Sequence, residues 1–160
     1  MDAHLFLDYA EAVLATVEAD PGHPHAPAMC RSAISRAYYA TYLLARELLG
    51  SLGIDVRNRA VTHTNLPFAL QNSGVLTLER LGNQLSALRG HRTRADYDLL
   101  ARDPETVSHA RVCVTLARST VQVLGIILAG KLAPPLDAEL VRDTILDWAR
   151  ANGQPFSEAP

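Results

Sequence analysis

Residues Ser32–Gly50 read SAISRAYYATYLLARELLG, and this stretch decides the fold class. Apolar and small side chains recur in it at three- and four-residue steps, which predicts a long helix over about 27–52. Ser32, Arg36 and Tyr39 share one face of that helix. A second face carries small residues that let another helix approach closely, namely Cys30, Ala33, Ala37, Ala40, Thr41, Leu44 and Leu48. An arginine and two adjacent tyrosines within such a helix indicate either internal packing or a polar site.

Helical periodicity continues along the rest of the chain, and no strand pattern competes with it. Apolar spacing predicts further helices over about 2–19, 75–92 and 103–131 and from 137 onward, with a short one after Asn65. Asp103 and Asp137 are expected to act as N-caps. The sequence therefore predicts an all-α, up-and-down helical bundle of about four to six helices. We expect the bundle to span 1–133, followed by a C-terminal extension over 134–160 with one helix and a frayed tail.

The composition is that of one globular domain, with 48% hydrophobic residues and a formal net charge of −2. No global basic field attracts nucleic acid, so any polyanion site has to be local. Cys30 and Cys113 fall in apolar helical patterns, which predicts buried thiols in a reducing compartment. We find no CxxC or other Cys/His ligand spacing and expect no metal or cofactor. No signal peptide and no apolar run of ~20 residues are visible, so a cytoplasmic protein without membrane contact is expected.

A second polar stretch, RGHRTRADYDLL over 89–100, has two interpretations. Cations are favoured near a helix C-terminus, and Asp96 could pair with Arg92 one turn earlier or with Arg94, which describes a solvated helix end. Alternatively, the stretch forms one site with Arg36 and Tyr39. The residues concerned are Arg89, His91, Arg92, Arg94, Asp96 and Tyr97.

Three motifs in this order resemble the HEPN domain family, small helical-bundle proteins often encoded beside minimal nucleotidyltransferases. The match is to the branch with a Ser-Arg-Ala-Tyr-Tyr-Ala helix, here residues 35–40. That branch carries a histidine after the helix, matched by His63, and an Arg-x-x-Ala-Asp-Tyr element, matched by Arg92, Ala95, Asp96 and Tyr97. The resemblance covers roughly residues 26–131 and implies a HEPN-like bundle.

Many HEPN proteins resemble metal-independent ribonucleases, whereas others only bind nucleotides or RNA. The ribonucleases pair an arginine, which clamps the phosphate, with a histidine a few residues later, which moves protons. In this chain Arg92 is followed by TRADY, and a formal match occurs instead at Arg57, Asn58 and His63. The catalytic candidates are thus His63, Arg92 and Arg57. The candidates for substrate binding are Arg36, Tyr39, Arg89, His91, Arg94, Asp96 and Tyr97.

Three functions are compatible with these residues. The first is an RNA- or nucleotide-directed HEPN protein, including a metal-independent ribonuclease that serves as the toxin of a toxin–antitoxin pair. The second is a non-catalytic binding module that partners a nucleotidyltransferase, which the departure after Arg92 favours. The third is a structural helical adaptor. We expect a homodimer, formed through the small-residue face of the second helix or through the helices near Arg92.

Overall fold

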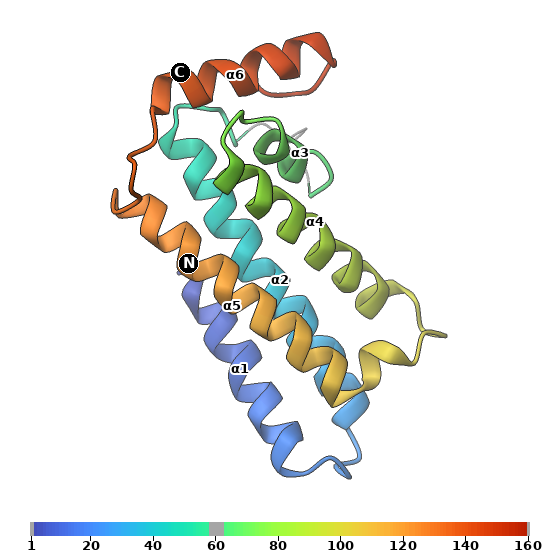
Figure 1. The fold of residues 1–160 in the computed structure, drawn as a ribbon. Helices are drawn as coiled ribbons and strands as arrows, with labels where there is room; N and C mark the ends of the chain where they lie inside the picture. The colour runs from blue at the N-terminus through green and yellow to red at the C-terminus, as the bar shows by residue number, and fades with distance from the viewer. Residues whose placement is uncertain (1, 58–62, 160) are drawn as a thin grey trace. The chain divides into compact units, whose positions relative to one another are not determined.

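The computed structural model describes residues 2–57 and 63–159. Its regular structure is helical throughout these residues (Figure 1), and the all-α prediction is confirmed. The elements are α1 (His4–Ala19), α2 (Ala26–Ser51), α3 (Leu66–Gln71), α4 (Leu76–Tyr97), the 3-10 turn η1 (Asp103–Glu105), α5 (Val107–Leu128) and α6 (Ala138–Ala151).

The chain forms two compact units. Unit 1 is Met1–Leu43 with Ala87–Val121, and unit 2 is Leu44–Ser86 with Gln122–Pro160. The long helices α2, α4 and α5 contribute segments to both units. We predicted a HEPN-like bundle over residues 1–133. Its boundary depends on membership of that family, so it stays a prediction.

Unit 1 packs α1 along α5 (Figure 1), and ion pairs at the rim hold the two helices together. Arg111 lies 2.7 Å from Glu18, and Arg118 lies 2.7 Å from Glu11. Between the helices of this unit lies an apolar core made of Leu7, Ala10, Leu14, Val17, Cys30, Ala33, Ile34, Ala37, Tyr38, Leu88, Ala110, Cys113, Val114 and Ala117.

The small-residue face of α2 lies inside the chain rather than on its surface. All seven predicted members of this face are buried. Small residues here bring neighbouring helices of the same chain close together, so the face is already covered. The prediction that it forms the homodimer contact is therefore wrong, whereas the homodimer itself stays a prediction.

Unit 2 contains α3 and α6, which contact each other. Gly82 of α4 allows α3 a close approach, because a Cβ at this position would lie 2.7 Å from the Pro67 carbonyl oxygen. Asp137 caps α6 as predicted, accepting a hydrogen bond from the Leu140 amide at 3.0 Å. The buried residues of this unit include Leu48, Leu49, Leu66, Leu70, Leu78, Leu81, Leu85, Leu124, Val141, Ile145 and Leu146.

The C-terminal tail was expected to fray, and the structure contradicts this. The Asp55 amide donates to the Ser157 carbonyl, and the Ala159 amide donates to the Gly53 carbonyl, both at 2.7 Å. Phe156 is buried between these tethers. The tail therefore belongs to unit 2 as an extended segment held by backbone hydrogen bonds.

Two helix boundaries differ from prediction, and both affect the candidate site. Helix α4 continues to Tyr97 instead of ending near 92, so the whole RGHRTRADY segment is helical. Helix α5 begins at Val107, because Asp103 starts the turn η1 instead. The cap of α5 is Thr106, whose hydroxyl oxygen accepts from the His109 amide at 3.3 Å.

Helix α5 is long and apolar enough to cross a membrane by length and composition. Buried core helices meet the same criterion. In unit 1 the Ala110, Cys113, Val114 and Ala117 face of α5 is buried against other helices. The exposed side carries Arg111 and Arg118, both paired with α1 carboxylates. One helix of this kind is weak evidence for a membrane span.

Candidate functional site

An open pocket in unit 1 lies between α1 and α2 beside Arg36. It has a volume of about 460 Å³ and is lined by Leu5, Phe6, Tyr9, Ser32 and Arg36, which we call the Arg36 pocket. Its size is that of a small-molecule site. Tyr9 is 54% exposed, so an aromatic face is available to a ligand at the rim.

Arg36 presents its charge to this pocket. Its guanidinium lies over the Phe6 ring at 5.8 Å and over the Tyr39 ring at 5.5 Å. No carboxylate of residues 2–57 or 63–159 lies within ion-pair distance of it. Cation–π contacts orient a guanidinium without neutralising it, so Arg36 keeps its charge for an anionic ligand.

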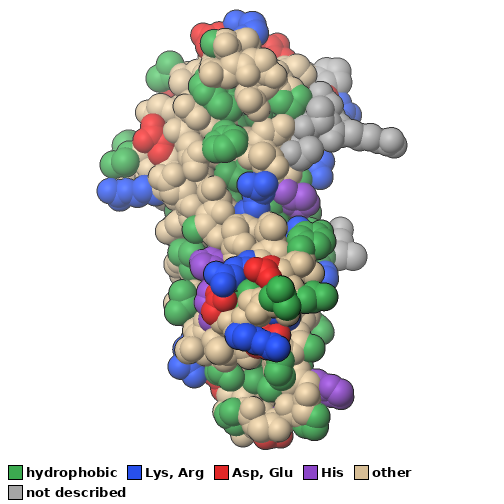
Figure 2. All heavy atoms as spheres, turned by 90° about the vertical axis from the view of Figure 1, so that its right-hand side faces the viewer, with side chains coloured by type: hydrophobic (Ala, Val, Ile, Leu, Met, Phe, Trp, Pro, Cys, Tyr) green, Lys and Arg blue, Asp and Glu red, His purple; other side chains and the backbone are tan. Residues whose placement is uncertain are grey.

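The face drawn in Figure 2 shows no large patch of Lys and Arg side chains. Lys and Arg side chains there are scattered among acidic and hydrophobic ones. This agrees with the formal net charge of −2 and leaves local arginines as the means of attracting a phosphate.

A second arginine, Arg92 of α4, is held in a dense polar cluster with Ser35, Tyr39, Asp96 and Tyr97, which we call the Arg92 cluster. Arg92 Nε lies 2.7 Å from Asp96 Oδ2, and Arg92 Nη2 donates to the Tyr39 hydroxyl at 3.0 Å. The guanidinium also lies over the Tyr97 ring at 5.0 Å. Asp96 additionally accepts a hydrogen bond from the Ser35 hydroxyl at 3.2 Å, which joins α4 to α2.

The Arg92 cluster stabilises the charged arginine. Burial alone would lower the pKa of the Arg92 guanidinium, but Tyr39, Tyr97 and Asp96 together raise it. Asp96 takes up much of the charge that a phosphate would need. Arg92 is thus an organised cation with a partner, whereas Arg36 is the cation that faces open space.

Tyr39 connects the Arg36 pocket with the Arg92 cluster. Its ring lies 5.5 Å from the Arg36 guanidinium and 5.5 Å from that of Arg92. The structure therefore brings Arg36, Tyr39, Arg92, Asp96 and Tyr97 together within unit 1. Their shared role in binding stays a prediction.

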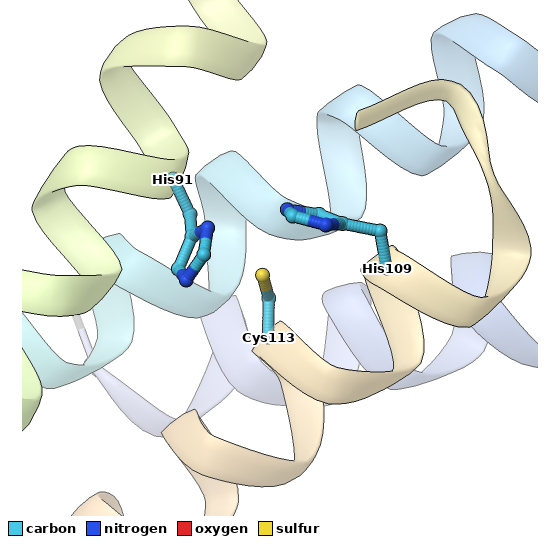
Figure 3. A group of neighbouring side chains, drawn as sticks. All are labelled: His91, His109 and Cys113. Atoms are coloured by element: carbon cyan, nitrogen blue, oxygen red, sulfur yellow. The ribbon is translucent and has the colours of Figure 1, made fainter. Parts of the chain in front are cut away.

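His91 points to different neighbours from Arg92, although the two are adjacent on α4. Successive helical residues project about 100° apart, and the ring of His91 lies 4.9 Å from that of His109 on α5. Cys113 completes this group, in which one nitrogen of each histidine and the sulfur lie within 4.8 Å of one another (Figure 3). No Cys/His ligand spacing was expected from the sequence, yet His109 and Cys113 stand four residues apart on one helical face. That spacing was the missed signal.

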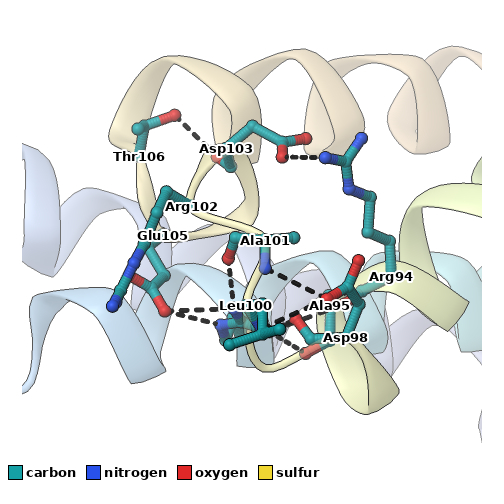
Figure 4. Close-up of polar contacts among 10 residues, drawn as sticks. Arg94, Ala95, Asp98, Leu100, Ala101, Arg102, Asp103, Glu105 and Thr106 are labelled. Atoms are coloured by element: carbon teal, nitrogen blue, oxygen red, sulfur yellow. Dashed lines mark hydrogen bonds and ion pairs between the residues drawn. The ribbon is translucent and has the colours of Figure 1, made fainter.

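Arg94 and Arg89 serve other contacts. Arg94 pairs with Asp103 at 2.8 Å, across the connection between α4 and α5 (Figure 4). Arg89 is half-buried on α4, and its charge acts on buried Tyr38. Burial nonetheless raises the pKa of the Tyr38 phenol well above its usual range. Neither arginine is positioned at the Arg36 pocket.

Sequence reasoning missed Arg31, which fastens the same connection. Its guanidinium donates to the carbonyl oxygens of Ala95, Asp98 and Ala101 and pairs with Glu105 at 3.0 Å. Figure 4 shows these acceptors on the loop between α4 and α5 and at the helix and turn that flank it. Nothing in the local sequence of Arg31 indicated partners more than sixty residues away, so no signal could have found it.

The remaining catalytic candidates lie in unit 2. Arg57 is mostly exposed, and its Nε lies 3.5 Å from Asp55 Oδ1. His63 is half-buried at the start of the second described segment. Asn58, the polar residue of the formal Arg…His match, lies outside the described residues. In unit 1, the Arg36 pocket and the Arg92 cluster contain no histidine among their described members.

Comparisons with protein-family models, with curated proteins and with solved structures found no match to this chain. The class of protein that the structure itself defines is a helical bundle with an arginine–aromatic pocket in unit 1. Such a pocket can stack a planar ring on tyrosine and hold a phosphate with arginine. Among the described residues that line this pocket there is no histidine and no carboxylate.

Proposed function

We propose that this protein binds a nucleotide or a short single-stranded RNA segment at the Arg36 pocket. The observation that carries the proposal is the Arg36 guanidinium, which has no ion pair within the described part of the chain and lies beside an open pocket with a half-exposed tyrosine at its rim. Single-stranded RNA is recognised by stacking on aromatic side chains and by arginine contacts to phosphate. The HEPN resemblance in the motifs at 35–40 and 92–97 points to the same ligand class.

Binding without turnover is the function that the geometry supports best. Metal-independent RNA cleavage requires a histidine that moves protons near the arginine that clamps the phosphate. In unit 1, His91 contacts His109 rather than Arg92, and Arg92 is occupied by Asp96. A nucleotidyltransferase partner and a cytoplasmic location accompany this proposal as expectations from the resemblance and the composition.

The direct test is fluorescence anisotropy with labelled single-stranded RNA, competed with mononucleotides at low salt. We expect Arg36→Gln to weaken binding about 10–100-fold, because a charge-assisted contact is lost. Tyr9→Ala should weaken it about fivefold or more through lost stacking. Arg80→Gln is the matched control, since Arg80 is an exposed arginine of α4 outside the pocket. Equal losses in Arg36→Gln and Arg80→Gln would mean that only net charge matters and would refute the site.

A second experiment tests whether the protein cleaves RNA. Total and transfer RNA are incubated in EDTA with wild type, His63→Ala and Arg92→Ala, and the products are separated on gels. We expect intact RNA throughout. Cleavage that survives EDTA and disappears in either variant would replace the binding proposal with a metal-independent ribonuclease.

A further inference from the structure

A second chemical site in unit 1 lies between α4 and α5, away from the contacts of Arg36. It consists of His91 on α4 and of His109 and Cys113 on α5 (Figure 3). Because His109 and Cys113 stand at positions i and i+4, both project from one face of α5 toward α4. The three side chains converge on the same small space, with the Cys113 sulfur turned toward both rings.

One atom of this group has no hydrogen-bond partner among residues 2–57 and 63–159. His109 Nε2 is buried and makes no hydrogen bond. A buried nitrogen without a partner is costly, since it has lost its contact with water. Burial of this atom beside a second imidazole and a thiol is the arrangement expected of an unloaded metal ligand.

The other nitrogen of His109 faces a carboxylate. His109 Nδ1 lies 3.7 Å from Asp103 Oδ2, which is within ion-pair distance but too long for a hydrogen bond. A shorter contact would hold a proton on Nδ1 and leave the Nε2 lone pair for a metal. Asp103 is itself held by Arg94 at 2.8 Å. Carboxylate–histidine pairs of this kind orient ligands in many zinc sites.

Packing alone accounts for part of the geometry. The rings of His91 and His109 meet edge to face at 4.9 Å and 76°, which is a favourable aromatic contact. Edge-to-face packing, however, leaves the Nε2 atom of His109 unsatisfied. It also gives no reason for a thiol at the meeting point of the two rings.

We propose that His91, His109 and Cys113 bind one zinc-class divalent transition metal ion, which joins α4 to α5 in unit 1. Two imidazoles and one thiolate are a ligand set that suits Zn²⁺, and a water molecule would fill the fourth tetrahedral position. Zinc bond lengths of about 2.0–2.3 Å place tetrahedral ligand atoms about 3.3–3.6 Å apart. From separations of up to 4.8 Å, side-chain rotations that close about 1 Å would suffice.

The protonation states are compatible with this role. Burial, and then the neighbouring His109, lower the pKa of His91, which favours the neutral imidazole that a metal needs as a ligand. Burial raises the pKa of the Cys113 thiol to about 12, so the metal-free thiol keeps its proton. On binding, the sulfur gives its proton to solvent and its electron pair to the metal, and no oxidation state changes.

The test uses the full chain, stripped with EDTA and titrated with Co²⁺ as a visible stand-in for Zn²⁺. We expect one equivalent to bind, with a thiolate-to-cobalt charge-transfer band and the intense visible bands of a tetrahedral site. Zn²⁺ should displace the cobalt and raise the melting temperature. Cys113→Ser should abolish the charge-transfer band, whereas Cys30→Ser, which changes the other buried cysteine, should retain it.

Two further variants keep the test decisive if a core substitution unfolds the protein. His91→Gln changes the half-buried ligand and should remove tetrahedral binding while circular dichroism stays helical. Asp103→Asn should lower the metal affinity about 10–100-fold by releasing His109. Cobalt uptake without a thiolate band would place the metal elsewhere, for example at His23 and His25, and would overturn the proposal. So would absence of uptake by folded wild type. The proposal of nucleotide binding is independent of the metal and is tested by the Arg36→Gln variant.

Discussion

Arg31 shows how one side chain can fix a connection that no local signal specifies. Its guanidinium donates to the carbonyl oxygen of Ala95 in the last turn of α4 and to those of Asp98 and Ala101 in the segment that follows, and it pairs with Glu105 of η1. The last carbonyl groups of a helix have no partner within the helix, and Arg31 supplies one for the Ala95 carbonyl. The planar fork of arginine suits this task, because its several N–H groups point in fixed directions.

Replacing Arg31 tests this role. We expect Arg31→Ala to lower the free energy of unfolding by about 2–4 kcal/mol, since several hydrogen bonds to a charged group are lost together. Arg31→Lys keeps the charge but not the fork, and should recover only part of the loss. Urea denaturation followed by circular dichroism measures both. A lysine variant as stable as wild type would show that charge, rather than the fork, holds the connection.

Asp96 is the residue that limits the charge of the Arg92 cluster. It pairs with Arg92 at 2.7 Å and accepts from Ser35. If RNA binds in unit 1, Asp96→Asn should increase affinity several-fold, because Arg92 is then available to a phosphate. The salt dependence should steepen by about 0.7 in the log–log slope, as one more counterion is released.

The control for Asp96 is Asp147→Asn, which changes the net charge equally at an exposed acid of α6. It should leave the affinity and the slope nearly unchanged. The Asp96 variant should also lose about 1 kcal/mol of stability, because its contacts with α2 and Arg92 are weakened. Unchanged affinity in a folded Asp96→Asn protein would remove Arg92 from the binding surface.

At the level of elements, helix α4 contains two glycines with opposite roles. A Cβ at Gly82 would meet the backbone of α3 at 2.7–2.8 Å, whereas a Cβ at Gly90 would meet nothing within 4 Å. We therefore expect Gly82→Ala to destabilise the protein by about 1–3 kcal/mol through overpacking. Gly90→Ala should stabilise it by about 0.5–1 kcal/mol through helix propensity. The thermal unfolding temperatures of the two variants should shift in opposite directions. A Gly82→Ala variant at least as stable as wild type would contradict the close α3–α4 contact.

The start of α5 is a second test at this scale. Thr106 has extended backbone angles of φ −98° and ψ 141°, and its hydroxyl oxygen caps the His109 amide. We expect Thr106→Ala to cost about 1 kcal/mol, whereas Thr106→Ser, which keeps the oxygen, should cost little. Denaturant midpoints give the comparison. Equal losses of stability in Thr106→Ala and Thr106→Ser would show that the hydroxyl oxygen does not cap α5.

The helices themselves were predictable because periodicity is a local property. Leu78, Leu81, Leu85 and Leu88 form the predicted seam of α4, and all four are buried. Asp137 caps α6 as its position indicated. Boundaries were less predictable. The Asp-Pro-Glu-Thr sequence at 103 fits a helix start, but its first residues turn as η1, and Asp103 binds Arg94 instead.

At the scale of the whole molecule, the partners of polar residues depend on segments far apart in sequence. The ordered motifs predicted that Arg36, Tyr39 and Arg92 lie close together, and both guanidinium groups do contact the Tyr39 ring. The contacts of Arg31 were not, and neither was the meeting of His91 with His109 and Cys113. The tail illustrates the same point, because its polar composition suggested fraying while the backbone of Gly53 and Asp55 holds it. The composition of a segment is a local property, whereas its attachment to the fold depends on the residues that it contacts.

The pH dependence of stability follows from one such long-range contact. Hydrogen bonds from Arg102 and then Arg31 lower the pKa of Glu105 below its ordinary value of 4.5. Below pH 4.5, Glu105 therefore becomes protonated in the unfolded chain while it is still ionised in the folded chain. The free energy of unfolding consequently falls as the pH falls. Above that pH the contribution is complete. Glu105→Gln removes it, so wild type should exceed this variant in stability at pH 7, and the difference should shrink as the pH falls below 4.5. Urea midpoints for both proteins across this range measure the difference, and a constant difference would show that the carboxylate charge of Glu105 does not hold the connection between α4 and α5.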